Sequence, residues 1–138
     1  MGILSPIIQD QLSRSKTGRL IIDLHRQDQP KDQTEEAKRK QYEEDIKRAR
    51  NIRAFSETDF WKNDLLPWLL KEWDMAGVEC LKSPAMHNNA DAVAMDTALQ
   101  RGRRNANEAV ITQLNLWLQM GDKAQEKMQA LNQEENSK

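Results

Sequence analysis

The sequence has few of the residues that build covalent or catalytic centres. Cys80 is the only cysteine in 138 residues, which excludes an internal disulfide and a thiolate metal cluster. Neither His25 nor His87 has a Cys, carboxylate or Ser neighbour at the spacing of a metal site or a catalytic triad. Gly-rich phosphate loops and the HExxH and GxSxG motifs are also missing. The sequence therefore predicts no enzyme, and no catalytic, metal or cofactor site.

An excess of charge and long apolar runs are missing as well. The chain has 21 basic and 22 acidic residues and a formal net charge of -1, so no overall field draws it to nucleic acid or anionic lipid. Its mean hydropathy is -0.88, and no apolar run approaches the roughly 20 residues of a membrane span. The start, MGILSPIIQDQLSRSK, lacks the basic segment and apolar core of a signal peptide. We expect a soluble, unprocessed protein without membrane contact.

Residues 1–33 are predicted to form an N-terminal arm. Ser5 and Pro6 have the residue types of a helix start, and Gly18 is expected to end this short helix. The next run, RLIIDLH at 19–25, alternates apolar and polar residues and predicts an extended segment. Because the sequence offers no second strand, its apolar face is expected to bind a partner. The predicted partner-binding residues of the arm are Leu20, Ile22 and Leu24.

A long charged helix is predicted over 34–54. Thr34 or Asp32 can cap it, and the first turn is acidic while the last turns are basic. Its apolar stripe is thin, so the helix is expected to pack along one narrow seam and to be solvated elsewhere.

The helical core is expected over 55–131. Ser56 and Asp59 resemble a capping box, and Pro67 predicts a break near 63–66 in the helix that follows. KSPAMHNN at 82–89 is expected to be a loop.

The last long helix is predicted over about 90–120, after a cap at Asn89. One apolar line runs along it at spacings of three and four: Met95, Leu99, Gly102, Ala106, Val110, Leu114 and Trp117. Gly121 and Asp122 predict a stop and the start of a short helix, and 132–138 is expected to be a frayed tail. The predicted fold is all-α, a helical hairpin or small bundle with an extended N-terminal arm and a long charged helix.

Three of the four tryptophans lie within FWKNDLLPWLLKEW, residues 60–73. One interpretation packs all three in the core. A single helix has only one inward face, however, and Trp73 lies about 140° from Trp68 on a regular helix. We therefore expect Trp73 to be in the core, against Gly102 and Ala106, and Trp61 and Trp68 to bind a partner, since tryptophan is enriched at binding hot spots.

The short basic run RGRR offers an alternative function. Arg101, Arg103 and Arg104 could contact phosphates together with the basic end of the first long helix. A solvated helix face that pairs with acidic side chains is the simpler interpretation. Nucleic acid is therefore a secondary candidate partner.

Two segments joined by a loop carry a family resemblance: FWKNDLLPWLLKEW and ALQRGRRNANEAVITQLNLWL. Together they resemble small helical proteins encoded among the virion and head-assembly genes of tailed bacteriophages. The resemblance covers roughly residues 56–120. It implies a non-enzymatic virion component, assembled in the host cytoplasm. The implied partners are a larger capsid, portal or tail protein, copies of the chain itself, or both.

Overall fold

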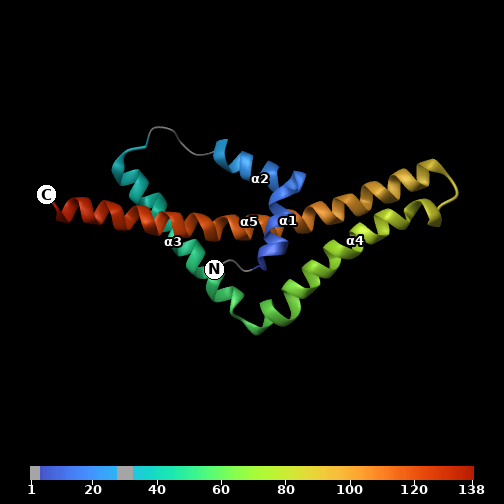
Figure 1. Ribbon diagram of the computed structural model, residues 1–138, viewed down its shortest axis with the longest axis horizontal. Helices are drawn as coiled ribbons and strands as arrows, with labels where there is room; N and C mark the ends of the chain where they lie inside the picture. Colours follow the sequence, from blue (N-terminus) through green and yellow to red (C-terminus); the bar gives the residue numbers. More distant parts are fainter. Residues whose placement is uncertain (1–3, 28–32) are drawn as a thin grey trace. The chain divides into compact units, whose positions relative to one another are not determined.

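The computed structural model of the chain describes residues 4–27 and 33–138, and these residues are all-α (Figure 1). No strand occurs in either range, which confirms the predicted fold class. The helices form two compact units. One contains the described residues up to Thr58 together with Thr112–Lys138, and the other is Asp59–Ile111. The longest helix, α5 (Ala90–Asn136), contributes its first part to the second unit and its last part to the first.

Two helices, α1 (Pro6–Arg14) and α2 (Lys16–Gln27), replace the expected extended arm. The predicted cap at Ser5 is confirmed, because its hydroxyl accepts from the Ile8 N–H at 3.5 Å. The break between the helices lies at Ser15 rather than Gly18. The Ser15 N–H donates to the Leu12 carbonyl at 3.2 Å, and its hydroxyl accepts from the Gly18 N–H at 2.9 Å. Ser15 thus satisfies backbone groups of both helix ends.

The prediction of an extended segment over 19–25 was wrong. Gly18 is buried, and Ile21, Ile22 and His25 are half-buried, a spacing of three, four and seven that is typical of one helix face. The same residues also fit an alternation, but a helix satisfies its own backbone groups and a lone strand does not. A Cβ at Gly18 would lie 2.1 Å from the Leu12 carbonyl oxygen, so the glycine permits the close turn from α1 into α2.

Helix α3 (Glu35–Ser56) matches the predicted charged helix and is two residues longer at its end. Thr34 caps it as predicted, accepting from the Ala37 N–H at 3.2 Å. The second predicted cap, Ser56, was wrong. Ser56 is the last residue of α3, and its hydroxyl donates to the Arg53 carbonyl at 2.8 Å.

The last part of α5 packs against α3. An ideal Cβ at Gly121 would lie 2.2 Å from the Ala49 Cβ and 3.0 Å from the Asp45 carbonyl oxygen. Arg53 pairs with Asp122. Farther along, Arg39 pairs with Glu135 at 2.6 Å.

The predicted stop at Gly121 and Asp122 was wrong, and so was the frayed tail, since α5 continues to Asn136. Gly121 lies inside α5, where it allows the close approach of α3 instead of ending a helix. Two side-chain pairs beyond it, through Asp122 and Glu135, hold the end of α5 against α3.

In the second unit, a π-helix, η1 (Phe60–Leu65), leads into α4 (Leu66–Met86). The Leu66 N–H donates to the Trp61 carbonyl, five residues back. Pro67 has no N–H to donate, so the regular α-helical ladder cannot continue through this turn. The predicted break near 63–66 is confirmed, in the form of a wider turn.

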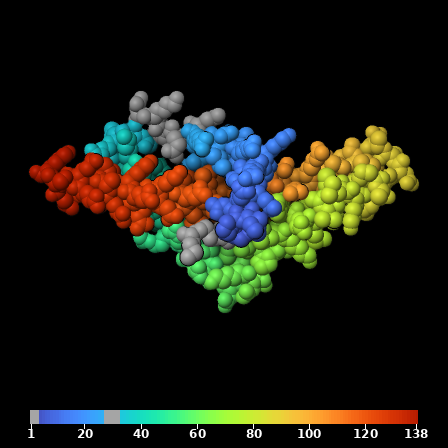
Figure 2. Space-filling view, viewed as in Figure 1, coloured from blue at the N-terminus to red at the C-terminus, as the bar shows by residue number. Residues whose placement is uncertain are grey.

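Helices α4 and α5 run antiparallel and form a hairpin within 59–111 (Figure 1). Their atoms lie directly against each other along the hairpin (Figure 2). The predicted loop was too long, because α4 continues through Pro84 to Met86. Asn89 caps α5 as predicted, its side-chain oxygen accepting from the Ala92 N–H at 2.7 Å.

Candidate interaction surface

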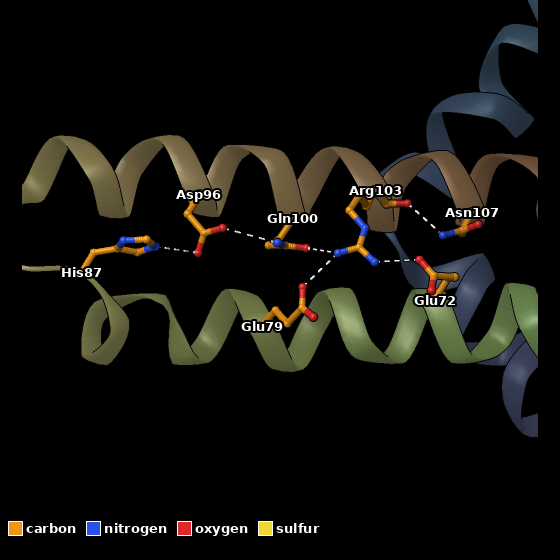
Figure 3. A network of polar contacts seen from close by, with 7 residues as sticks. All are labelled: Glu72, Glu79, His87, Asp96, Gln100, Arg103 and Asn107. Carbon is orange, nitrogen blue, oxygen red and sulfur yellow. Dashed lines mark hydrogen bonds and ion pairs between the residues drawn. The ribbon is translucent and has the colours of Figure 1, made fainter.

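The inner face of the hairpin is polar (Figure 3). Arg103 reaches from α5 to two carboxylates of α4, Glu72 at 2.7 Å and Glu79 at 2.9 Å. It also donates to the Gln100 side-chain oxygen at 2.7 Å, and the Gln100 amide donates to Asp96 at 3.3 Å. A chain of polar contacts therefore joins α5 to α4.

The network continues to the loop, where His87 Nε2 lies 3.4 Å from Asp96 Oδ2. The nearby Ser83 hydroxyl and the hydrogen bond from Gln100, with a smaller contribution from His87, hold the pKa of Asp96 below its ordinary value. At the other end, the hydrogen bond to Glu72 raises the pKa of Arg103. Both charged forms are therefore favoured by the fold.

Asp96→Asn is expected to reduce the loss of folding stability that occurs as the pH falls. The pKa of Asp96 is lowered from 3.8 in the fold. Its ionised form therefore stabilises the folded chain above that value, and the contribution is lost as the pH falls through the folded-state pKa. Urea unfolding from pH 7 to pH 3 checks this. The wild-type midpoint should fall more steeply than that of Asp96→Asn; parallel curves would contradict a stabilising role of the ionised carboxylate.

Trp73 also joins the two helices, but not in the predicted groove. Its indole N–H donates to Glu108 at 2.8 Å, and the Arg104 guanidinium lies 4.8 Å from the centre of its ring. Gly102 and Ala106 are exposed, and no atom lies within 4 Å of an ideal Cβ at Gly102. The groove expected at these two residues is therefore not the place where Trp73 packs.

The three arginines of the alternative function have different surroundings. Arg103 is held by the two carboxylates of α4, and Arg104 stacks on Trp73 and lies 3.4 Å from Glu108. Arg101 is exposed. Contacts within the chain account for Arg103 and Arg104 without a phosphate, which favours the simpler interpretation of this run.

Trp61 and Trp68, the predicted anchors, differ sharply in exposure. Trp68 is 55% exposed, whereas Trp61 is only 3% exposed. The expectation that both face outward was therefore wrong for Trp61. Seven residues bring two side chains to the same side of a regular α-helix, but the π turn between them adds a residue. That extra residue rotates the following helix by about 100°.

The three predicted partner-binding residues on α2 also differ in exposure. Leu20 and Leu24 are exposed, one helical turn apart. Ile22 is half-buried and lines a cavity of about 420 Å³ with Leu12 and Leu116. Leu20 and Leu24 therefore remain candidates for a surface contact, whereas Ile22 belongs to the packing of its own unit.

An apolar surface runs along α4 on its solvent side. We define the outer α4 face by four exposed residues: Trp68, Met75, Val78 and Leu81. These residues are spaced by seven, three and three along the helix. The three buried residues of α4, spaced seven apart, are Leu69, Ala76 and Ser83. The helix thus buries one large apolar side chain and two small ones, and leaves four large apolar side chains exposed.

No family model, curated protein or solved structure matches this chain. In the ranges 4–27 and 33–138, no group of three or more His, Cys, Asp or Glu residues could hold a metal ion. Over the same part of the chain, no helix is both long and apolar enough to cross a membrane.

Proposed function

We propose that this chain is a non-enzymatic interaction protein that docks on a larger oligomeric protein through the outer α4 face. The observation that carries the proposal is the exposure of large apolar side chains along one helix, with Trp68 at their start. Large contiguous apolar patches are uncommon on monomeric proteins, and those that occur often mark interaction sites. The resemblance of residues 56–120 to phage head-assembly proteins supports a virion as the setting and a capsid, portal or tail protein as the partner.

Trp68 is the residue of this face best suited to anchor a partner. Its ring offers a large rigid surface, and more than half of the residue is exposed before any partner binds. Leu20 and Leu24 of α2 offer a second, smaller apolar contact. A partner that covers either surface would gain the hydrophobic free energy of the area removed from water.

Trp68→Ala is expected to weaken partner binding by about 2 kcal/mol or more. The stability of the isolated chain should change by no more than roughly 0.5 kcal/mol, as is usual for a surface position. Mass measurements of the chain mixed with the larger products of its neighbouring genes identify the partner. Titration calorimetry then compares Trp68→Ala with the wild type.

Arg50→Ala is the control, because Arg50 is an exposed polar residue on α3, outside the outer α4 face. It should bind like the wild type. Equal binding by all three chains would remove Trp68 from the interface, and a chain whose mass never changes in any mixture would contradict the proposed function.

A further inference from the structure

The first part of α5 carries an apolar face that points away from α4. Its central residues are spaced by four, three and four: Met95, Leu99, Gly102 and Ala106. Met95 is 76% exposed and Leu99 is 63% exposed, and space is open around Gly102. We call this face, from Ala92 to Val110, the α5 seam. It is the line that the sequence pattern assigned to the internal core.

The two sides of α5 are reversed relative to an ordinary amphipathic helix. A surface helix usually turns its apolar stripe to the core and its polar side to water. Here Asp96, Gln100 and Arg103 lie on the side of α5 that faces α4 (Figure 3), whereas the seam residues Met95 and Leu99 are exposed. The helix therefore has a packing surface that nothing within its own unit covers.

The unit 59–111, all of which is described, also buries little apolar surface. Its buried hydrophobic residues are Trp61, Leu69, Ala76 and Ile111. Units of this size seldom obtain enough stability from one core, and association is a common remedy. Covering the α5 seam would remove Met95, Leu99 and Val110 from water.

The seam is complementary to itself in shape. Its two bulky residues, Met95 and Leu99, precede its two smallest, Gly102 and Ala106. A two-fold axis between residues 100 and 101 places Met95 opposite the partner's Ala106. The same axis places Leu99 opposite the partner's Gly102. One symmetry operation thus fits both large side chains into both open positions, as an isologous contact requires.

The charge pattern agrees with this arrangement. Between Ala92 and Val110, the residues at the seam positions are uncharged, and the same axis places Val110 beside the partner's Asp91 at the end of the contact. No like charges meet in the antiparallel register. We infer that the α5 seam is the interface of a symmetric antiparallel dimer of this chain.

The size of the seam sets the expected strength of the dimer. From Ala92 to Val110 the helix extends roughly 27 Å, with a width of about 10 Å. This is smaller than the area of about 800 Å² per partner in a standard stable interface. This is about a third of the standard area, so we expect a weak, reversible monomer–dimer equilibrium with a dissociation constant in the high micromolar range.

Gly102→Leu tests the interface in the full chain. Because a leucine would fill the space expected for the partner's Leu99, we expect the dissociation constant to rise at least tenfold, measured by sedimentation equilibrium. The helical content should stay the same, since no atom lies within 4 Å of an ideal Cβ at this position. Arg101→Leu is the control, because Arg101 is exposed but lies to one side of the seam. A Gly102→Leu chain that dimerises like the wild type would overturn the proposal.

Cysteine cross-linking tests the register independently, in a Cys80→Ala background. A mixture of Met95→Cys and Ala106→Cys chains should form disulfide-linked heterodimers under mild oxidation. Met95→Cys alone should not, because antiparallel packing separates the two copies of residue 95 by roughly 16 Å. Self-cross-linking of Met95→Cys would overturn the antiparallel register. If the chain stays monomeric up to millimolar concentration and forms no cross-links, the dimer is overturned. The seam would then have to bind a different protein.

Discussion

Gly121→Ala is expected to lower the free energy of unfolding by about 1–3 kcal/mol, although alanine is the better helix former. The added Cβ would lie 2.2 Å from the Ala49 Cβ and 3.0 Å from the Asp45 carbonyl oxygen. Neither obstacle is the end of a flexible side chain, so α3 must move away from α5. That movement would loosen the buried contact at Ala49.

Gly102→Ala provides the matched control. It is the same chemical change in the same helix, but space is open around Gly102. We expect it to raise the free energy of unfolding by about 0.5–1 kcal/mol, the ordinary gain of replacing glycine inside a helix. Urea unfolding followed by circular dichroism, at concentrations too low for association, compares the two variants. If both are stabilised alike, α3 does not approach α5 at Gly121.

The features predicted correctly are those decided by a few neighbouring residues. The caps at Ser5, Thr34 and Asn89 depend on a side-chain oxygen two or three residues from an unpaired N–H, and all three bonds form. The break before Pro67 depends on a missing N–H and is equally local. Together with the helical periodicity, these signals suffice for the all-α class.

The features predicted wrongly depend on what a residue packs against. Gly121 has the composition of a helix end, yet its function in the fold is to let Ala49 come close. Over 19–25 the apolar residues fit both an alternating and a helical pattern, and only the burial of one helix face, at Gly18, Ile21 and Ile22, distinguishes them. Sequence spacing does not contain that information.

The α5 seam shows the same distinction for the candidate site. The spacing of Met95, Leu99, Gly102 and Ala106 identifies an apolar face, but the expectation that this face packs in the core was wrong, because Met95 and Leu99 are exposed. Within the chain, α4 packs on the polar side of α5, through contacts such as that of Arg103 with Glu72. Carboxylate and guanidinium spacing across two helices is not visible in the periodicity of either one.

Trp61→Ala is expected to have the largest effect on stability, a loss of about 3–5 kcal/mol. Trp61 is only 3% exposed, so truncation removes nearly all of the contacts of a large ring and leaves a cavity. Its position follows from the π turn: the Leu66 N–H bonds to the Trp61 carbonyl. Because of this wider turn, the side chains of Trp61 and Trp68 point to different sides of the helix.

Trp68→Ala is the matched control for this change, since it removes the same side chain from a position that is 55% exposed. Its free energy of unfolding should stay within roughly 0.5 kcal/mol of the wild type. Circular dichroism is the suitable signal for the urea titrations, because both variants lose an indole fluorophore. Large losses in both variants would mean that Trp68 is also buried, and the outer α4 face would lose its anchor. A small loss in both would show that the π turn does not direct Trp61 into the core. A large loss at Trp61 alone is the expected result, because burial of one ring and exposure of the other both depend on the turn that Pro67 forces open.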